Sequence, residues 1–212
     1  MPGTRLRLGL LRSLPFARLV GLIAAFAKAE PSVSLELTEG NAAQLATLLE
    51  RGRLDATITL FEQRSDRQTS AVLFREPYCI AAAVDHPLAR RVRCRLAEFD
   101  GMAFVLRSDC EVQREAQRIF VANGIRPRIL HRGASDERAI ALARAGLALT
   151  LVPESLLCDG LAPITVDELD FGRRIALCWR AGAPEPVEQL HQFAVSQQWS
   201  GAATAGRLAV AH

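Results

Sequence analysis

The sequence lacks long hydrophobic runs, paired cysteines and clusters of basic residues. No segment approaches the roughly 20 apolar residues needed to span a bilayer, so we expect no membrane span. The five cysteines are an odd number without a Cys-x-x-Cys pair, which favours reduced thiols in a cytoplasmic protein. The formal net charge of +3 comes with scattered arginines and by itself predicts no nucleic-acid surface.

Signatures of catalysis, cofactor binding and metal binding are also missing. The glycines make no dinucleotide or phosphate-loop pattern, and there is no nucleophile elbow. His86, His131 and His191 have no carboxylate or cysteine at ligand spacing. We therefore expect no metal site, no cofactor and no catalytic residue. Half of the residues are hydrophobic, which excludes disorder for most of the chain.

The amino-terminal segment imitates a secretory signal. Arginines precede an apolar stretch at residues 19–27, and residues 27–29 have the small-x-small form of a cleavage site. Arg18 interrupts the apolar stretch, however, and residues 6–11 make a plausible first strand. We favour the strand, and an exported protein stays as the alternative.

Residues 135–155 predict a capped helix followed by a buried strand. Ser135 is a good helix N-cap, and Asp136 places negative charge in the first turn. Gly146 should end the helix, and residues 147–152 are apolar without alternation, as in a strand covered on both faces of a parallel sheet. In such sheets, ligands bind beyond the carboxyl ends of the strands, where helix N-termini present free N–H groups.

The chain before residue 61 alternates between strand and helix patterns. Ser13 should cap the first helix, with Pro15 in its first turn, and Gly52 should end the second. This order predicts parallel strands joined by right-handed crossovers. The expected strands are residues 6–11, 33–38 and 54–60, and the expected helices are residues 15–29 and 41–52.

The remaining chain continues the α/β alternation. Residues 62–70 should form a polar loop, Pro77 should mark a change of direction between two strands, and the Ala- and Gly-rich residues 201–212 should fray. The expected strands are residues 71–76, 78–84, 102–106, 128–131, 147–152 and 175–179, and the expected helices are residues 111–123, 135–146 and 187–199.

A set of short motifs, weak singly but specific as an ordered set, spans residues 6 to about 199. With these motifs the chain resembles the effector-binding domain of LysR-type transcriptional regulators. They include Pro31-x-Val33-x-Leu35-x-Leu37-x-Glu39-Gly40, His86-Pro87-Leu88-Ala89, Ala145-Gly146-Leu147 and Val152-Pro153-Glu154-Ser155.

The resemblance implies an α/β fold of the type 2 periplasmic-binding-protein kind. Two Rossmann-like lobes would be joined by two crossing strands, with a small-molecule cleft between them. Lobe I would comprise residues 1–75 and 169–212, and lobe II residues 76–168. Family members begin with a winged helix-turn-helix domain, which has no counterpart in this sequence. The chain is thus similar to the sensing half of a regulator and would contact DNA only through such an additional domain.

The resemblance also implies where an effector binds, because in the family it lies between helix N-termini of both lobes. Short polar side chains at helix starts suit a carboxylate, phosphate or sulfate, although each alone could be an ordinary cap. Arginines that follow strands could clamp an anion or could be solvated rim residues. The implied ligand-binding residues are Arg12, Ser13, Leu14, Asn41, Arg107, Ser108, Gly133, Ser135 and Asp136.

One of these residues and one neighbour leave alternatives open. Asp136 would repel an anion, but it could instead serve the helix dipole or accept a hydrogen bond from a ligand hydroxyl. Cys110 lies in the same loop as Arg107, and a thiol sensor is conceivable there. Its acidic neighbours should raise its pKa, however, so we favour a bystander.

The helix at residues 15–29 is apolar over most of its circumference, which is more than one buried face needs. In the family this helix packs against the second-lobe helix of another subunit, here residues 111–123. We therefore expect a homodimer, with Ala116, Ile119 and Phe120 as the complementary surface.

Three functions compete at this point. A ligand-sensing regulatory domain with a small anionic effector is the one we favour. An exported solute-binding protein is disfavoured by the odd cysteine count and the intact first strand. A small enzyme on the same fold is disfavoured by the lack of a paired carboxylate or activated nucleophile at strand ends.

Overall fold

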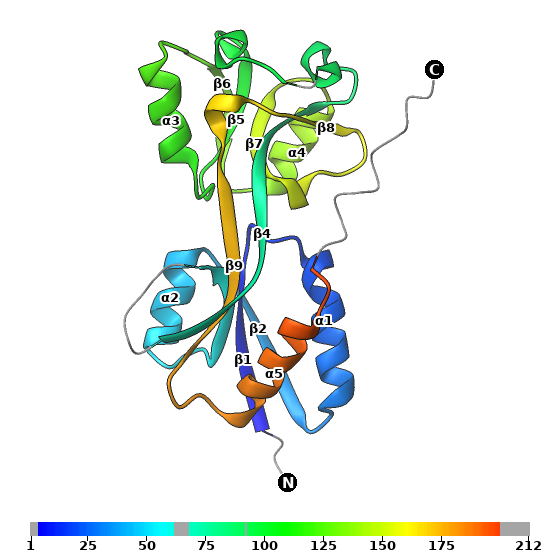
Figure 1. Ribbon diagram of the computed structural model, residues 1–212, viewed down its shortest axis with the longest axis vertical. Helices are drawn as coiled ribbons and strands as arrows, with labels where there is room; N and C mark the ends of the chain where they lie inside the picture. Colours follow the sequence, from blue (N-terminus) through cyan, green and yellow to red (C-terminus); the bar gives the residue numbers. More distant parts are fainter. Residues whose placement is uncertain (1–3, 62–67, 92, 200–212) are drawn as a thin grey trace. The chain divides into compact units, whose positions relative to one another are not determined.

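The structure is a computed structural model that describes residues 4–61, 68–91 and 93–199. The chain divides into two compact units, Met1–Arg75 with Arg173–His212, and Glu76–Gly172. Strands β4 (Gln68–Ala83) and β9 (Gly172–Arg180) carry the chain between the units (Figure 1). Each unit has its own hydrophobic core.

The first unit is built around β1 (Thr4–Leu11), which pairs in parallel with β2 (Val33–Gly40) and β3 (Ala56–Leu60). This confirms the parallel arrangement predicted from the sequence. β9 then adds to β3 in the antiparallel direction. Helix α2 (Ala42–Glu50) lies on one side of this sheet, and α1 (Phe16–Ala29) and α5 (Glu185–Ser196) lie on the other (Figure 1).

The second unit has a mixed sheet. β5 (Ala103–Arg107) pairs in parallel with β6 (Arg128–Gly133) and β7 (Leu149–Pro153), and β4 pairs antiparallel with β7 and with β8 (Leu161–Ile164). The helices are α3 (Gln113–Ala122) and α4 (Asp136–Arg144), with short 3₁₀ turns at Pro87–Arg90, Leu96–Phe99, Glu154–Leu156 and Asp167–Leu169. The strands follow the order β2-β1-β3-β9-β4-β7-β5-β6.

The ends of α2 and α4 fall where their capping residues predict. Asn41 and Gln44 form a reciprocal capping box at the start of α2, and the Ser135 hydroxyl accepts a hydrogen bond from the backbone N–H of Arg138 at the start of α4. Just after these helices, Gly52 and Gly146 have φ angles of +66° and +70°. Only glycine adopts such a backbone conformation without strain, so both helices end there.

The prediction that Ser13 caps the first helix is wrong. Pro15 is the N-cap residue of α1, and no side chain there accepts a capping hydrogen bond. The Ser13 hydroxyl accepts from Arg173 instead, because β9 brings a buried guanidinium next to it.

Pro77 does not separate two strands, and one strand was missed. β4 runs without interruption through Pro77, and its pairing with β7 begins at the next residue, Tyr78. β8 was not predicted, since it is four residues long and contains Pro163. The predicted polar loop at 62–70 lies largely outside the described residues, and β4 already begins at Gln68; the predicted fraying at 201–212 also lies outside them.

Two of the three residues of α3 that were predicted to contact another subunit face the core of their own unit instead. Ala116 and Phe120 are buried in the core of their own unit, so they are not available as the complement of another subunit. Val121 is a large apolar residue that this helix leaves exposed. No helix among residues 4–61, 68–91 and 93–199 is long and apolar enough to cross a membrane.

Candidate functional site

The carboxyl ends of β1 and β2 bring together the four predicted site residues of the first unit. Leu11 is the register partner of Gly40, and the backbone N–H of Arg12 donates to the Gly40 carbonyl at 2.9 Å. Residues 12–14 and Asn41 therefore leave neighbouring strands at the same edge. Arg12 is exposed there, whereas Leu14 is buried in the core.

A buried arginine that sequence reasoning missed lies beside Ser13. Arg173 donates from Nη1 to the Ser13 hydroxyl at 2.8 Å and from Nη2 to the Ser13 carbonyl at 3.1 Å. The available signal was strand alternation, because Arg173 is two residues from buried Ile175 and so points to the same face. The edge of this unit thus holds two cationic side chains, Arg12 and Arg173.

The carboxyl ends of β5 and β6 bring together the predicted residues of the second unit. Arg107 is the register partner of Gly133, and the backbone N–H of Ser108 donates to the Gly133 carbonyl at 2.8 Å. Ser135 and Asp136 follow directly at the start of α4. The five predicted residues of this unit therefore form one cluster.

Arg107 is an internal residue of this cluster, with a side chain only 1% exposed. Its Nε donates to Asp136 Oδ1 at 2.7 Å, and its Nη1 donates to the Leu151 carbonyl at 3.2 Å. Burial lowers the pKa of Arg107, but the hydrogen bond and attraction to Asp136 outweigh this, so its pKa is raised. Arg107 is thus not a solvated rim residue, and Asp136 neutralises much of its charge.

One donor of this buried guanidinium remains unused. Nη2 of Arg107 has no hydrogen-bond partner within the described part of the chain. A buried N–H without an acceptor is unfavourable by roughly 1–3 kcal/mol. Such a group is a natural contact for a ligand or water oxygen.

Cys110 follows in the loop after β5 and is only partly accessible. Burial raises the pKa of its thiol; Arg107 opposes this, while Glu111 and Asp136 add to it in smaller measure. The raised pKa of Cys110 agrees with the sequence prediction, but its main cause is burial rather than the acidic neighbours. Glu111 itself accepts a hydrogen bond from the hydroxyl of Tyr78, a contact that only the fold brings about.

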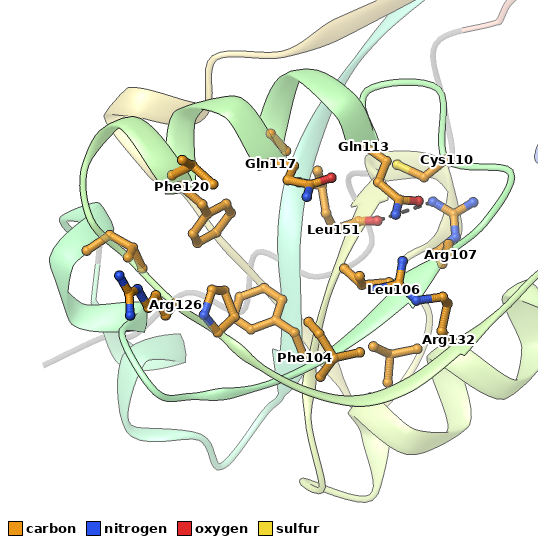
Figure 2. Close-up of a pocket in the computed structure, with 16 residues that line it drawn as sticks. Phe104, Leu106, Arg107, Cys110, Gln113, Gln117, Phe120, Arg126, Arg132 and Leu151 are labelled. Atoms are coloured by element: carbon orange, nitrogen blue, oxygen red, sulfur yellow. Dashed lines mark hydrogen bonds between the residues drawn. The ribbon is translucent and has the colours of Figure 1, made fainter.

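A cavity of about 260 Å³ lies in the second unit between α3 and the strands β5 and β6 (Figure 2). Phe104, Phe120 and Arg126 lie toward one end, and Arg107, Gln113, Cys110 and Arg132 lie toward the other (Figure 2). Sequence reasoning missed this cavity, because its lining comes from separate elements that only the fold brings together. Nowhere among the described residues do three His, Cys, Asp or Glu side chains come together as a possible metal site.

Comparison with known proteins matches this chain to one protein family and to relatives that are named as transcriptional regulators. A family model described as the LysR substrate binding domain matches residues 1–199. The hydrogen peroxide-inducible genes activator of Dickeya chrysanthemi is 28% identical over 185 residues, which cover 84% of this chain and 61% of that protein. The chain thus spans about three-fifths of that relative's length.

Solved structures share the fold. The regulatory domain of CcmR from Synechocystis PCC6803, in complex with 2-PG, has a TM-score of 0.79 at 18% identity and covers 91% of this chain and 96% of that one. The effector-binding domain of BenM with its effector benzoate has a TM-score of 0.73 at 22% identity, covering 91% of each chain.

Proposed function

Because this chain belongs to the LysR substrate-binding domain family, we propose that it is the ligand-sensing domain of a LysR-type transcriptional regulator. Its two compact units would be the two lobes of that domain. Promoter recognition would belong to a winged helix-turn-helix domain, which is not part of this sequence. The observation that carries the proposal is the family match over residues 1–199, together with the clustering of polar residues at the carboxyl edge of each unit.

We place the effector at these carboxyl edges and propose that it is a small anion. In the first unit, the exposed Arg12 and the buried Arg173 supply positive charge at the edge where β1 ends. In the second unit, Ser135 and the unused Nη2 of Arg107 supply polar contacts. Asp136 works against an anion, but it is already paired with Arg107. The benzoate bound by the BenM domain is an anion of this kind.

Titration calorimetry tests this proposal. A panel of small carboxylates and phosphates is titrated into the full chain, with neutral and cationic molecules of similar size as controls. We expect binding of at least one anion, weakened on the order of fivefold or more by Arg12→Gln because a charged hydrogen-bond donor is lost. Arg51→Gln is the matched control, since Arg51 is also exposed and lies in the same unit away from this edge. Binding of the controls alone would refute an anionic effector.

We further propose a homodimer in which α1 packs against α3 of a second copy. Phe16 and Val20 are large apolar side chains that α1 leaves 48% and 46% exposed. On α3, Val121 offers an apolar contact, since it is 71% exposed. Burial of such side chains is the usual driving force for association.

We propose no catalytic activity and a cytoplasmic location for this regulator. Its relatives are named as regulators of transcription, which act where the DNA is. A solute-binding role on the same fold would require export and a transporter. The peroxide-related name of one relative suggests a thiol sensor, but the raised pKa of Cys110 disfavours reaction of its thiol with an oxidant.

A further inference from the structure

The proposed function assigns no ligand to the cavity between α3 and strands β5 and β6, although Arg107 of its lining also belongs to the proposed effector site. We propose that it is a second binding site, which takes a small organic anion with an apolar body, such as a phenylalkyl carboxylate. Its volume of about 260 Å³ is just below the roughly 300–1,000 Å³ of typical small-molecule pockets, so its ligand must be small.

One end of the cavity suits an apolar group. Phe104 and Phe120 meet edge to face with their ring centroids 5.8 Å apart, and Ile125 lies beside them in the lining. All three residues are buried and apolar, and Arg126 is the charged lining residue toward this end. An aromatic or short alkyl group would gain contact area here and leave water.

The other end suits a single negative charge. The Arg132 guanidinium lies there with the Gln113 amide (Figure 2), and the Arg132 side chain has no hydrogen bond or ion pair to any described residue. Arg107 also lies at this end, but it is already paired with Asp136. The lining itself contains no Asp or Glu. A carboxylate at this end would therefore meet the charged guanidinium of Arg132 and the amide donor of Gln113.

The arrangement selects against two other kinds of ligand. An inorganic phosphate or sulfate would face the apolar wall and lose hydration without replacement. A neutral aromatic molecule would fill the Phe104 end but leave Arg132 without its anion. The two ends of the cavity together thus define an amphiphilic ligand.

Calorimetric titration of the full chain with 3-phenylpropanoate tests this proposal. We expect 3-phenylpropanamide, which has the same shape without charge, to bind on the order of tenfold more weakly. Acetate, which has the charge without the ring, should be weaker still. Equal binding of the acid and the amide would overturn the proposed carboxylate site, and so would no detectable binding of 3-phenylpropanoate.

Two matched arginine variants locate the bound acid. Arg132→Gln should weaken 3-phenylpropanoate binding about three- to fivefold, because Arg132 is partly solvated. Arg128→Gln should leave binding within about twofold, since Arg128 is exposed on the same strand but outside the cavity lining. Both residues are on the surface, so we expect both variants to fold. Loss of affinity in Arg128→Gln equal to that in Arg132→Gln would overturn the assignment.

A third variant separates this site from the proposed effector site. Arg12→Gln alters the edge of the first unit and should not change binding of 3-phenylpropanoate in the cavity. If Arg12→Gln abolishes binding while Arg132→Gln does not, the acid occupies the effector site, so the cavity proposal fails while the proposed function stands. Nuclear Overhauser contacts between the ligand ring and the rings of Phe104 and Phe120 should confirm the cavity; their absence in a saturated complex would refute it.

Discussion

Asp55 shows how a single buried carboxylate can stabilise the first unit. It accepts hydrogen bonds from the backbone N–H of Arg7 at 2.8 Å, from Nε at 3.0 Å and from Nη2 at 2.6 Å. Burial raises the pKa of Asp55, but these bonds and the charge of Arg7 outweigh it, so its pKa is lowered. The ionised carboxylate therefore stabilises the folded state.

We expect Asp55→Asn to lower the free energy of unfolding by about 1.5–3 kcal/mol at pH 7, as for a hydrogen bond to a charged group. Because the folded-state pKa lies below the ordinary value of 3.8, the contribution is complete above that pH and is lost as the pH falls through the folded pKa. Urea unfolding at neutral pH and near pH 3 measures this. Glu36→Gln, which breaks an exposed pair with Arg5, should have little effect at either pH.

The cysteines should differ strongly in reactivity. Burial, with smaller contributions from Glu154 and Glu76, raises the pKa of Cys79 to about 12, and the pKa of Cys110 is raised as well. Cys158 is exposed. Since the thiolate is the reactive form, we expect iodoacetamide at pH 8 to label Cys158 first and Cys79 only on unfolding. Mass spectrometry of timed digests measures the order. Early labelling of Cys110 would contradict the bystander interpretation.

At the level of elements, Gly9 allows β1 to pack closely against its neighbours. A Cβ atom there would lie 2.6 Å from Leu54 Cδ1 and 2.9 Å from both Leu45 Cδ2 and Thr57 Cγ2. The two leucines are buried in the core and cannot both move away.

We expect Gly9→Ala to destabilise the chain by about 1–3 kcal/mol through overpacking. Gly21→Ala is the opposite case, since the nearest atom to a new Cβ in α1 is Gln197 Nε2 at 3.5 Å. Alanine should stabilise that helix by roughly 0.5–1 kcal/mol. Denaturant unfolding of both variants measures whether the free energy of unfolding falls in Gly9→Ala and rises in Gly21→Ala. A loss of stability in both would contradict this explanation.

Local patterns predicted those elements whose ends depend on neighbouring residues. The caps Asn41 and Ser135 and the stops Gly52 and Gly146 act within one turn of a helix, so the sequence nearby was enough. Ser13 was misassigned because its hydrogen bond comes from Arg173, 160 residues away. The ion pair of Arg107 with Asp136 and the burial of Cys110 likewise depend on strands meeting, which local patterns do not describe.

Strand predictions failed where local signals are ambiguous. Pro77 predicts a break, but β4 continues through it between its neighbours β9 and β7. β8 is too short to show alternation. In the candidate site, the predicted residues of each unit do lie together, because parallel strands place their carboxyl ends at one edge.

At the level of the whole molecule, association of two chains is open to test. Val20→Glu places a charge on the exposed apolar face of α1, and we expect it to shift a dimer to monomer at micromolar concentration. Val84→Glu is the matched control, because Val84 is 57% exposed but lies outside both helices. Sedimentation velocity measures both. A monomeric wild-type chain at this concentration would defeat the dimer proposal.

The pairing of β3 with β9 has a consequence for synthesis. β3 aligns residues 56–60 with residues 175–179, whereas Glu76–Gly172 is continuous in the chain. On the ribosome, the whole of the second unit is therefore synthesised before β9, which completes the sheet of the first unit. Until β9 has been synthesised, the nascent chain exposes an open sheet edge at β3, the kind of surface that chaperones shield.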